Sequence, residues 1–179
     1  MIYPRSAIKP LQAVFLVESG AADEFGLTDN ELALACASHN GEPGHVDAVR
    51  NWLARLGLDE QVLECGTHAP RRDKDKALLI ENGLSPGPAH NNCSGKHCGF
   101  LSSAKFLGES VAGYINRSHP VQQAVPDLVG DMTGVSPGGR PGGIAGCGLP
   151  VVGIPNETMY VAVPSFAPDT RASVARQLG

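Results

Sequence analysis

The chain has 179 residues, 42% of them hydrophobic, so it is long enough to enclose a core and we expect one domain, residues 1–179. Its net charge of −4 provides no basic surface for nucleic acid, and no stretch approaches the roughly 20 apolar residues of a membrane span. Five cysteines without the spacing of a disulfide scaffold favour reduced thiols and a cytoplasmic location.

Hydrophobic periodicity and turn residues divide the chain into helices and connecting segments. Helices are expected over residues 6–19, 28–38, 45–57, 94–107, 119–129 and 167–179. Thr28 and Glu31 form a capping-box pattern, and Pro126 is expected to kink or end its helix. Short strands are expected at residues 60–65 and 151–155, a charged surface loop at 71–76 and a glycine-rich loop at 136–150.

Ser6 and Lys9 lie three residues apart at the start of the first predicted helix, so their side chains share one face. A desolvated, neutral lysine can take the proton of a serine hydroxyl and make it a nucleophile. The same spacing also fits a helix-capping serine followed by an exposed lysine. Ser38, at the end of the second predicted helix, is either a turn residue or a second serine that relays a proton or orients a substrate.

The stretch "HNNCSGKHCGFL" places Cys93, Lys96 and His97 within about one helical turn. Zinc prefers thiolate and imidazole ligands and usually takes three or four, so this cluster needs a distant partner. Cys147, between two glycines in "AGCGLP", is the clearest candidate. A lysine ligand would have to lose its proton, which a metal ion can drive. The alternative is a set of buried, reduced cysteines without a metal.

The segments "YPRSAIKPLQAVFLVESG", "ACASHNGEPGHV", "HNNCSGKHCGFL" and "GCGLP" together resemble the bacterial asparaginase family typified by the inducible, thermolabile Rhizobium etli enzyme. The resemblance covers about residues 3–155, and "NNCSGKH" is its most specific part. Residues 156–179 do not follow the family pattern.

The resemblance implies an α/β (α+β) fold similar to serine β-lactamases and penicillin-binding proteins, with a sheet flanked by helices that is incomplete in this chain. It implies hydrolysis of L-asparagine to L-aspartate and ammonia through an acyl-enzyme. The residues matched to the family's roles are the nucleophile Ser6, its base Lys9 and the second serine Ser38; the zinc ligands Cys93, Lys96 and Cys147; and the substrate contacts Arg5, Asn92 and His97.

The sequence departs from the family pattern in two ways. Ala145 stands where the pattern "DGCG" has an aspartate that binds substrate, so a partner for the substrate ammonium is lost. The chain is also much shorter than the family's and lacks its second catalytic lysine, which predicts truncation at both ends. A sheet without outer strands exposes an edge that a homodimer or a partner chain would cover.

Two other functions remain open at this stage. One is a non-catalytic remnant that binds zinc or a small amide through Cys93, Lys96 and Cys147. The other is a Ser-Lys hydrolase of a different amide, such as glutamine or a lactam.

Overall fold

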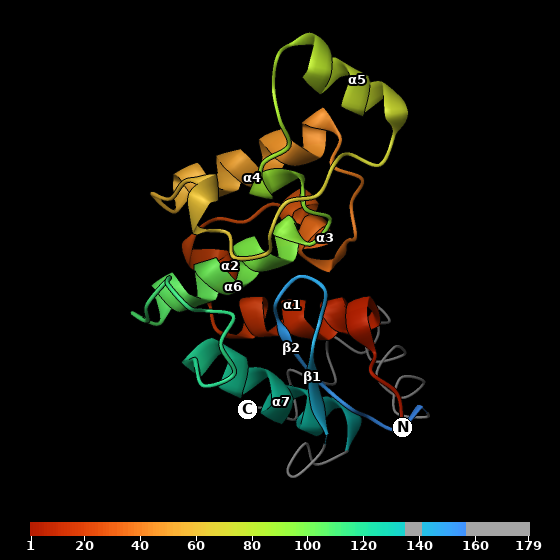
Figure 1. Ribbon diagram of the computed structural model, residues 1–179. Helices are drawn as coiled ribbons and strands as arrows, with labels where there is room; N and C mark the ends of the chain where they lie inside the picture. Colours follow the sequence, from red (N-terminus) through yellow and green to blue (C-terminus); the bar gives the residue numbers. More distant parts are fainter. Residues whose placement is uncertain (135–140, 157–179) are drawn as a thin grey trace.

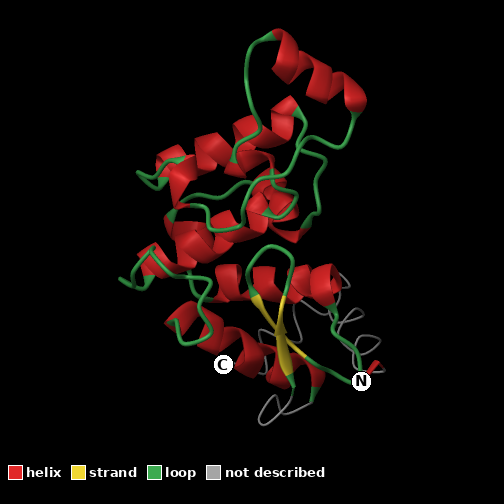
Figure 2. Ribbon diagram, viewed as in Figure 1, coloured by secondary structure: helices red, strands yellow, loops and turns green. Residues whose placement is uncertain are grey.

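Helices form most of the structure, and a single β-hairpin lies at one end (Figures 1 and 2). The computed structural model describes residues 1–134 and 141–156. Its elements are η1 (Arg5–Ile8), α1 (Lys9–Glu18), α2 (Ala21–Glu24), α3 (Asp29–Cys36), α4 (Pro43–Arg55), η2 (Glu60–Val62), α5 (Asp73–Glu81), η3 (Pro88–His90), α6 (Ser94–Phe106), α7 (Pro120–Thr133), β1 (Gly142–Ile144) and β2 (Pro150–Val152). The three labelled η are short 3₁₀ helices.

Helix α6 is the central element of the fold. It contacts α1, α2, α3, α4 and α7, and its residues from Ser94 to Ala104 are all buried. Its inward-facing hydroxyls are satisfied within the core, since Ser102 donates to the Cys98 carbonyl and accepts a 2.9 Å hydrogen bond from Trp52 Nε1. Because α6 is enclosed from Ser94 to Ala104, the side chains at its N-terminus are held in place by the surrounding helices.

Local sequence signals explain the helices that surround α6. The capping box predicted at Thr28 and Glu31 is formed and begins α3. Helix α4 buries the predicted face of Val46, Val49 and Leu53, and Gly57 follows it with a φ of 68°. The bounds of these helices therefore follow from local sequence signals, and packing on α6 supplies most of their stability.

The β-hairpin is small but connects the two ends of the described chain. Strands β1 and β2 pair antiparallel, with Gly143 opposite Val151. Beyond β2, Ile154 forms an isolated antiparallel bridge with Ile2. This bridge holds the segment before η1 against the open end of the hairpin, opposite to the hairpin turn.

Helix α5 projects from the rest of the structure at the top of Figure 1. It makes no extensive contact with another element of the described residues. Two of its apolar side chains, Leu78 and Ile80, are 45% and 76% exposed. Helix α5 is therefore an appendage to the core.

Several predictions of secondary structure were wrong. Residues 60–65 contain the 3₁₀ helix η2 in place of a strand, and the predicted charged loop at 71–76 contains the start of α5, where Asp73 and Asp75 favour the positive helix N-terminus. Helix α7 continues through Pro126. The glycine-rich segment includes β1, and the predicted C-terminal helix lies outside the described residues. In the part of the chain that is described, the sheet has only two strands, and no helix has the length and apolarity to span a membrane.

The crossing of α3 and α6 depends on the absence of a side chain at Gly95. A Cβ there would lie 2.5 Å from the Leu34 carbonyl oxygen and 2.6 Å from Leu34 Cγ. We expect Gly95→Ala to lower the free energy of unfolding by about 1–3 kcal/mol, because the helices must move apart. The measurement is the urea unfolding midpoint.

Gly44 provides a matched control because it too is the second residue of a helix, α4, and a Cβ there would meet nothing within 4 Å. Gly44→Ala should leave stability unchanged or raise it by up to about 1 kcal/mol. Equal midpoints for the two variants would show that α3 and α6 do not depend on this close approach.

Candidate active site

Lys9, the first residue of α1, is completely buried, with 0% exposure. Its Nζ donates to the Ala37 carbonyl and to Ser38 Oγ, the latter at 2.9 Å. Helix α3 ends at Cys36 and Ala37 is extended, which turns both acceptors toward α1. Burial lowers the pKa of Lys9, and the charge of Lys96 lowers it further. The interpretation of Lys9 as an exposed lysine is therefore wrong.

Ser6 lies in η1, one turn before Lys9, and its side chain is exposed. Its hydroxyl makes no hydrogen bond with Lys9, since the amine is directed to Ser38. The preceding residue, Arg5, has a φ of 50°, the only left-handed non-glycine conformation in residues 1–134 and 141–156. Such strained residues cost about 1–3 kcal/mol and are concentrated at functional sites. Ser6 is thus accessible and follows a strained residue.

Cys93, Lys96 and Cys147 come together although Cys147 lies in a distant part of the chain. Lys96 Nζ is 3.1 Å from Cys147 Sγ, and all three side chains are buried. A hydrogen bond from Cys93 lowers the pKa of Cys147, with further contributions from His97 and Lys96. The same hydrogen bond raises the pKa of Cys93. The arrangement therefore favours a Cys147 thiolate beside a protonated Cys93 thiol.

The two groups of residues form one continuous cluster. Cys93 is close enough to Lys9 to raise its pKa, against the larger lowering by burial, and Lys9 is also under the influence of Lys96 and Cys147. The cluster therefore extends from Ser38 through Lys9 to the pair of thiols. Its members come from η1–α1, the end of α3, the start of α6 and the β1–β2 turn.

His97 is buried with 0% exposure and lies next to Cys147. Its Nδ1 is 2.6 Å from the Tyr114 hydroxyl, which also accepts a 3.0 Å hydrogen bond from the Glu64 N–H. His97 lowers the pKa of Cys147, and its Nε2 has no hydrogen-bond partner among the described residues. Tyr114 therefore fixes the orientation of the His97 ring against the thiol.

The backbone around the two cysteines is held by specific turns. Asn91 donates to the Cys65 carbonyl at 2.8 Å and accepts from the Cys93 N–H at 2.8 Å, so it anchors the start of α6. Cys147 lies in the β1–β2 turn beside Gly148, which has a φ of 85° that favours glycine. Both cysteines are thus placed by local backbone geometry.

His39 connects the Ser38 segment to α6. Its Nδ1 accepts from the Gly41 N–H at 3.1 Å, so Nε2 carries the proton and donates to Ser94 Oγ at 2.8 Å. Burial, followed by the charges of His45 and Lys9, lowers the pKa of His39 to about 4. At neutral pH a neutral His39 therefore links the segment after α3 to the start of α6. The backbone N–H of His39 donates to the Asn92 carbonyl, at 3.2 Å.

A family model described as L-asparaginase II matches residues 1–178, nearly the whole chain. The chain belongs to the L-asparaginase II family. This finding confirms the predicted membership of an asparaginase family and supports an amidohydrolase that acts on a small molecule. Among curated proteins, none matches the chain.

The cysteine cluster of this asparaginase-family chain offers a mixed set of donors for a metal. Across residues 1–134 and 141–156, no group of three His, Cys, Asp or Glu side chains is arranged to hold a metal ion. The cluster has two thiols and one amine, from Cys93, Cys147 and Lys96. Zinc accepts sulfur and nitrogen donors, and the lowered pKa of Cys147 favours the thiolate that it requires, whereas Cys93 and Lys96 would each have to release a proton on binding. The donor set therefore fits zinc in the type of its atoms, and zinc would have to drive the loss of two protons.

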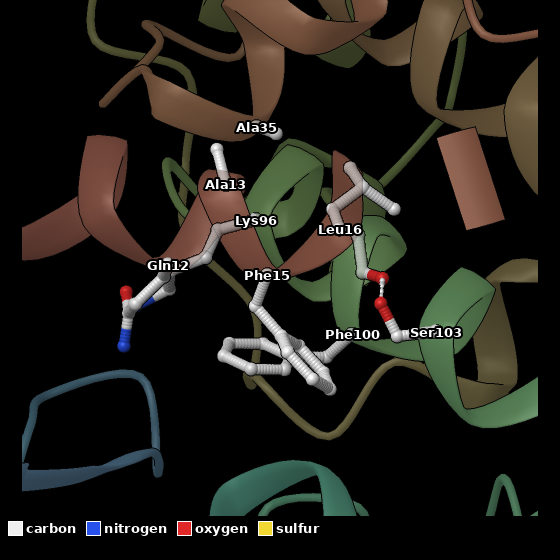
Figure 3. A pocket seen from close by; sticks show the side chains of 9 residues that line it. Gln12, Ala13, Phe15, Leu16, Ala35, Lys96, Phe100 and Ser103 are labelled. Atoms are coloured by element: carbon white, nitrogen blue, oxygen red, sulfur yellow. Dashed lines mark hydrogen bonds between the residues drawn. The ribbon is translucent and has the colours of Figure 1, made fainter. Parts of the chain in front are cut away.

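The other residues expected at the site differ in what they offer. Arg5 is exposed, and Asn92 is half-buried. Ala145 is half-buried, next to the turn that carries Cys147, and provides no charge for a substrate ammonium. Beside the site, the stem of Lys96 lines a small hollow with Phe15 and Phe100 (Figure 3).

Sequence reasoning missed Tyr114, Asn91 and the His39–Ser94 pair. Asn91 lies two residues before Cys93, so the sequence could have predicted an Asx turn at the start of α6. Tyr114 carries no such signal, because its contact with His97 arises only from the packing of the segment after α6.

Proposed function

We propose that the chain hydrolyses L-asparagine to L-aspartate and ammonia by a Ser-Lys acyl-enzyme mechanism of the Rhizobium etli type, on a β-lactamase-like fold, in the cytoplasm. The observation that supports this most is the buried Lys9 amine, 2.9 Å from the Ser38 hydroxyl. A solvent-exposed lysine would be protonated and unable to act as a base at neutral pH.

The hydrogen bonds of Lys9 suit a neutral amine. A neutral primary amine has two N–H groups and one lone pair, and Lys9 uses two N–H groups on Ala37 and Ser38. The lone pair is then left to accept a proton. The lowered pKa of Lys9 raises the fraction of the amine in this neutral form.

In the proposed reaction Ser6 Oγ attacks the side-chain amide carbon of asparagine, and its proton passes to Lys9. Lys9 returns the proton to the leaving nitrogen, the C–N bond breaks, and ammonia leaves an aspartyl ester on Ser6. Water attacks this ester while Lys9 takes its proton, which then returns to Ser6 Oγ as aspartate departs. Ser38 holds the amine and can relay the proton.

The proposed substrate contacts are Arg5, Asn92 and His97. The exposed guanidinium of Arg5 is suited to the substrate carboxylate. Because His97 is enclosed, it would act on the substrate through Cys147. We further propose that Cys93, Lys96 and Cys147 hold a zinc ion. When bound, zinc would supply positive charge that stabilises the thiolates and attracts a substrate carboxylate.

A covalent-adduct experiment tests the nucleophile. We expect acid-quenched wild type treated with L-aspartic acid β-methyl ester to carry one aspartyl group on the peptide with Ser6. Ser6→Ala should lose the adduct, whereas Ser38→Ala should still form it, more slowly. The measurement is peptide mass spectrometry. An adduct on Ser38 would reverse the roles of the two serines, and no adduct at all would favour a non-catalytic binding protein.

Ala145 favours one alternative substrate class. Without a carboxylate at this position, the site loses a charge-assisted hydrogen bond to the substrate ammonium, a contribution of about 1.5–3 kcal/mol. Binding of an amide without an α-ammonium would not be weakened by the absence of this carboxylate. The adduct experiment repeated with an acyl donor that lacks the ammonium distinguishes asparagine from such an amide by the relative rates of adduct formation.

A further inference from the structure

A second hollow lies between α1, α7 and the hairpin, elements that are adjacent in Figure 1. It has a volume of about 580 Å³, including its open mouth. Its walls are largely apolar, with Ile8, Val125, Val151 and Ile154 among them. Ligand sites commonly combine apolar walls of this kind with a few placed polar groups.

Two polar groups in this hollow have no protein partner. Gln12 and Gln122 line it and are 7% and 4% exposed. Within the described part of the chain, Gln12 Oε1 and Gln122 Nε2 make no hydrogen bond, so they do not reach each other. In Figure 3 the Gln12 amide is directed away from Phe15 and Phe100, toward the hairpin side. Buried polar groups normally have hydrogen-bond partners, so a third group is needed to form hydrogen bonds with both side-chain amides.

The chemistry of the two atoms specifies that third group. Gln12 Oε1 requires a donor and Gln122 Nε2 requires an acceptor. A primary carboxamide presents an N–H donor and a carbonyl acceptor on one small planar group. The space open to the centre of a water molecule is about 40 Å³, several times the roughly 10–15 Å³ that one water needs, so a ligand of a few heavy atoms fits.

Arg117 adds a preference for negative charge. Its side chain lines the same hollow and is exposed, and it has no ion pair among residues 1–134 and 141–156. A guanidinium at the mouth would bind a carboxylate attached to the carboxamide, with two parallel hydrogen bonds.

We propose that this hollow is a binding site for short primary carboxamides that carry a carboxylate, with Gln12 and Gln122 holding the amide and Arg117 the acid. Lys9 is not among the residues that line this hollow, and the proposal goes beyond the proposed hydrolysis, because nothing in the lining is a nucleophile or a base. Its ligand would belong to the same chemical class as the proposed substrate.

The test is a titration of the full chain with succinamate, followed by NMR of ¹⁵N-labelled glutamine side chains. We expect saturable shifts of the Gln12 and Gln122 amide signals. 4-Oxopentanoate, which keeps the carboxylate and the carbonyl but has no N–H and no leaving group, should bind at least about tenfold more weakly. Propionamide, which lacks the carboxylate, should also bind more weakly, and the difference should vanish in Arg117→Gln.

Gln122→Met should weaken succinamate binding at least about tenfold, whereas Gln123→Met, on the neighbouring exposed residue, should leave it unchanged. Lys9→Met should retain binding, which separates this site from the failure of the proposed hydrolysis. Absence of shifts at both glutamines, or equal affinity for succinamate and 4-oxopentanoate in the wild type, would mean that the hollow holds only water. The comparison of ligands needs no variant to fold.

Discussion

Lys9→Met is expected to reduce kcat/KM for ammonia release from L-asparagine by about 10²–10⁴, the contribution usually made by a positioned general base. Methionine is close to lysine in length but cannot accept a proton. In the wild type, activity should rise with pH as Lys9 loses its proton. Because burial lowers the pKa of Lys9, this rise should be centred below the ordinary lysine value of 10.5.

Lys105→Met is the matched control, since Lys105 is an exposed lysine on α6. It should keep the wild-type rate and pH profile. The urea midpoint of each variant shows whether a loss of rate reflects unfolding. A folded Lys9→Met protein with undiminished ammonia release would remove the lysine from the mechanism.

Cys147→Ala is expected to lower the zinc content of the purified, dialysed protein from about one ion per chain to a trace. The substitution removes one of three protein donors and the thiol with the lowered pKa. Added zinc should also raise the thermal midpoint of the wild type and not of the variant, since a ligand stabilises only the state that binds it. Metal analysis and thermal unfolding supply the two measurements.

Cys36→Ala is the control for a cysteine outside the cluster, because Cys36 is a half-buried free thiol at the end of α3. It should retain zinc. If the wild type binds none, or if Cys147→Ala binds as much as the wild type, then Cys93 and Cys147 are packing residues and not metal ligands.

The elements best predicted from the sequence were those with local signals. The capping box at Thr28 and the apolar face of α4 were both correct, because each depends on side chains one to four residues apart. The strand predicted at residues 60–65 was wrong, since a short run with mixed polarity is compatible with either a strand or a turn of helix. Pro126 was misleading because α7 tolerates it.

The site was reached from the sequence mainly through its resemblance to a family. Spacing alone suggested that Ser6 and Lys9 meet, yet Lys9 bonds Ser38, a contact that depends on how α3 ends. The approach of Lys96 to Cys147 spans 51 residues, and no local rule predicts such a contact. Tertiary packing determines these pairs, and the roles assigned to them in catalysis and zinc binding stay predictions.

The enclosure of α6 has a consequence for how this protein should fail on heating. The amides of a helix covered on every side can exchange with solvent only when the entire fold opens. Because Cys93, Lys96 and His97 belong to that helix or its cap, these three side chains keep their places until the fold opens. Their release and the loss of tertiary structure should therefore follow a single melting curve, while the projecting α5 frays earlier.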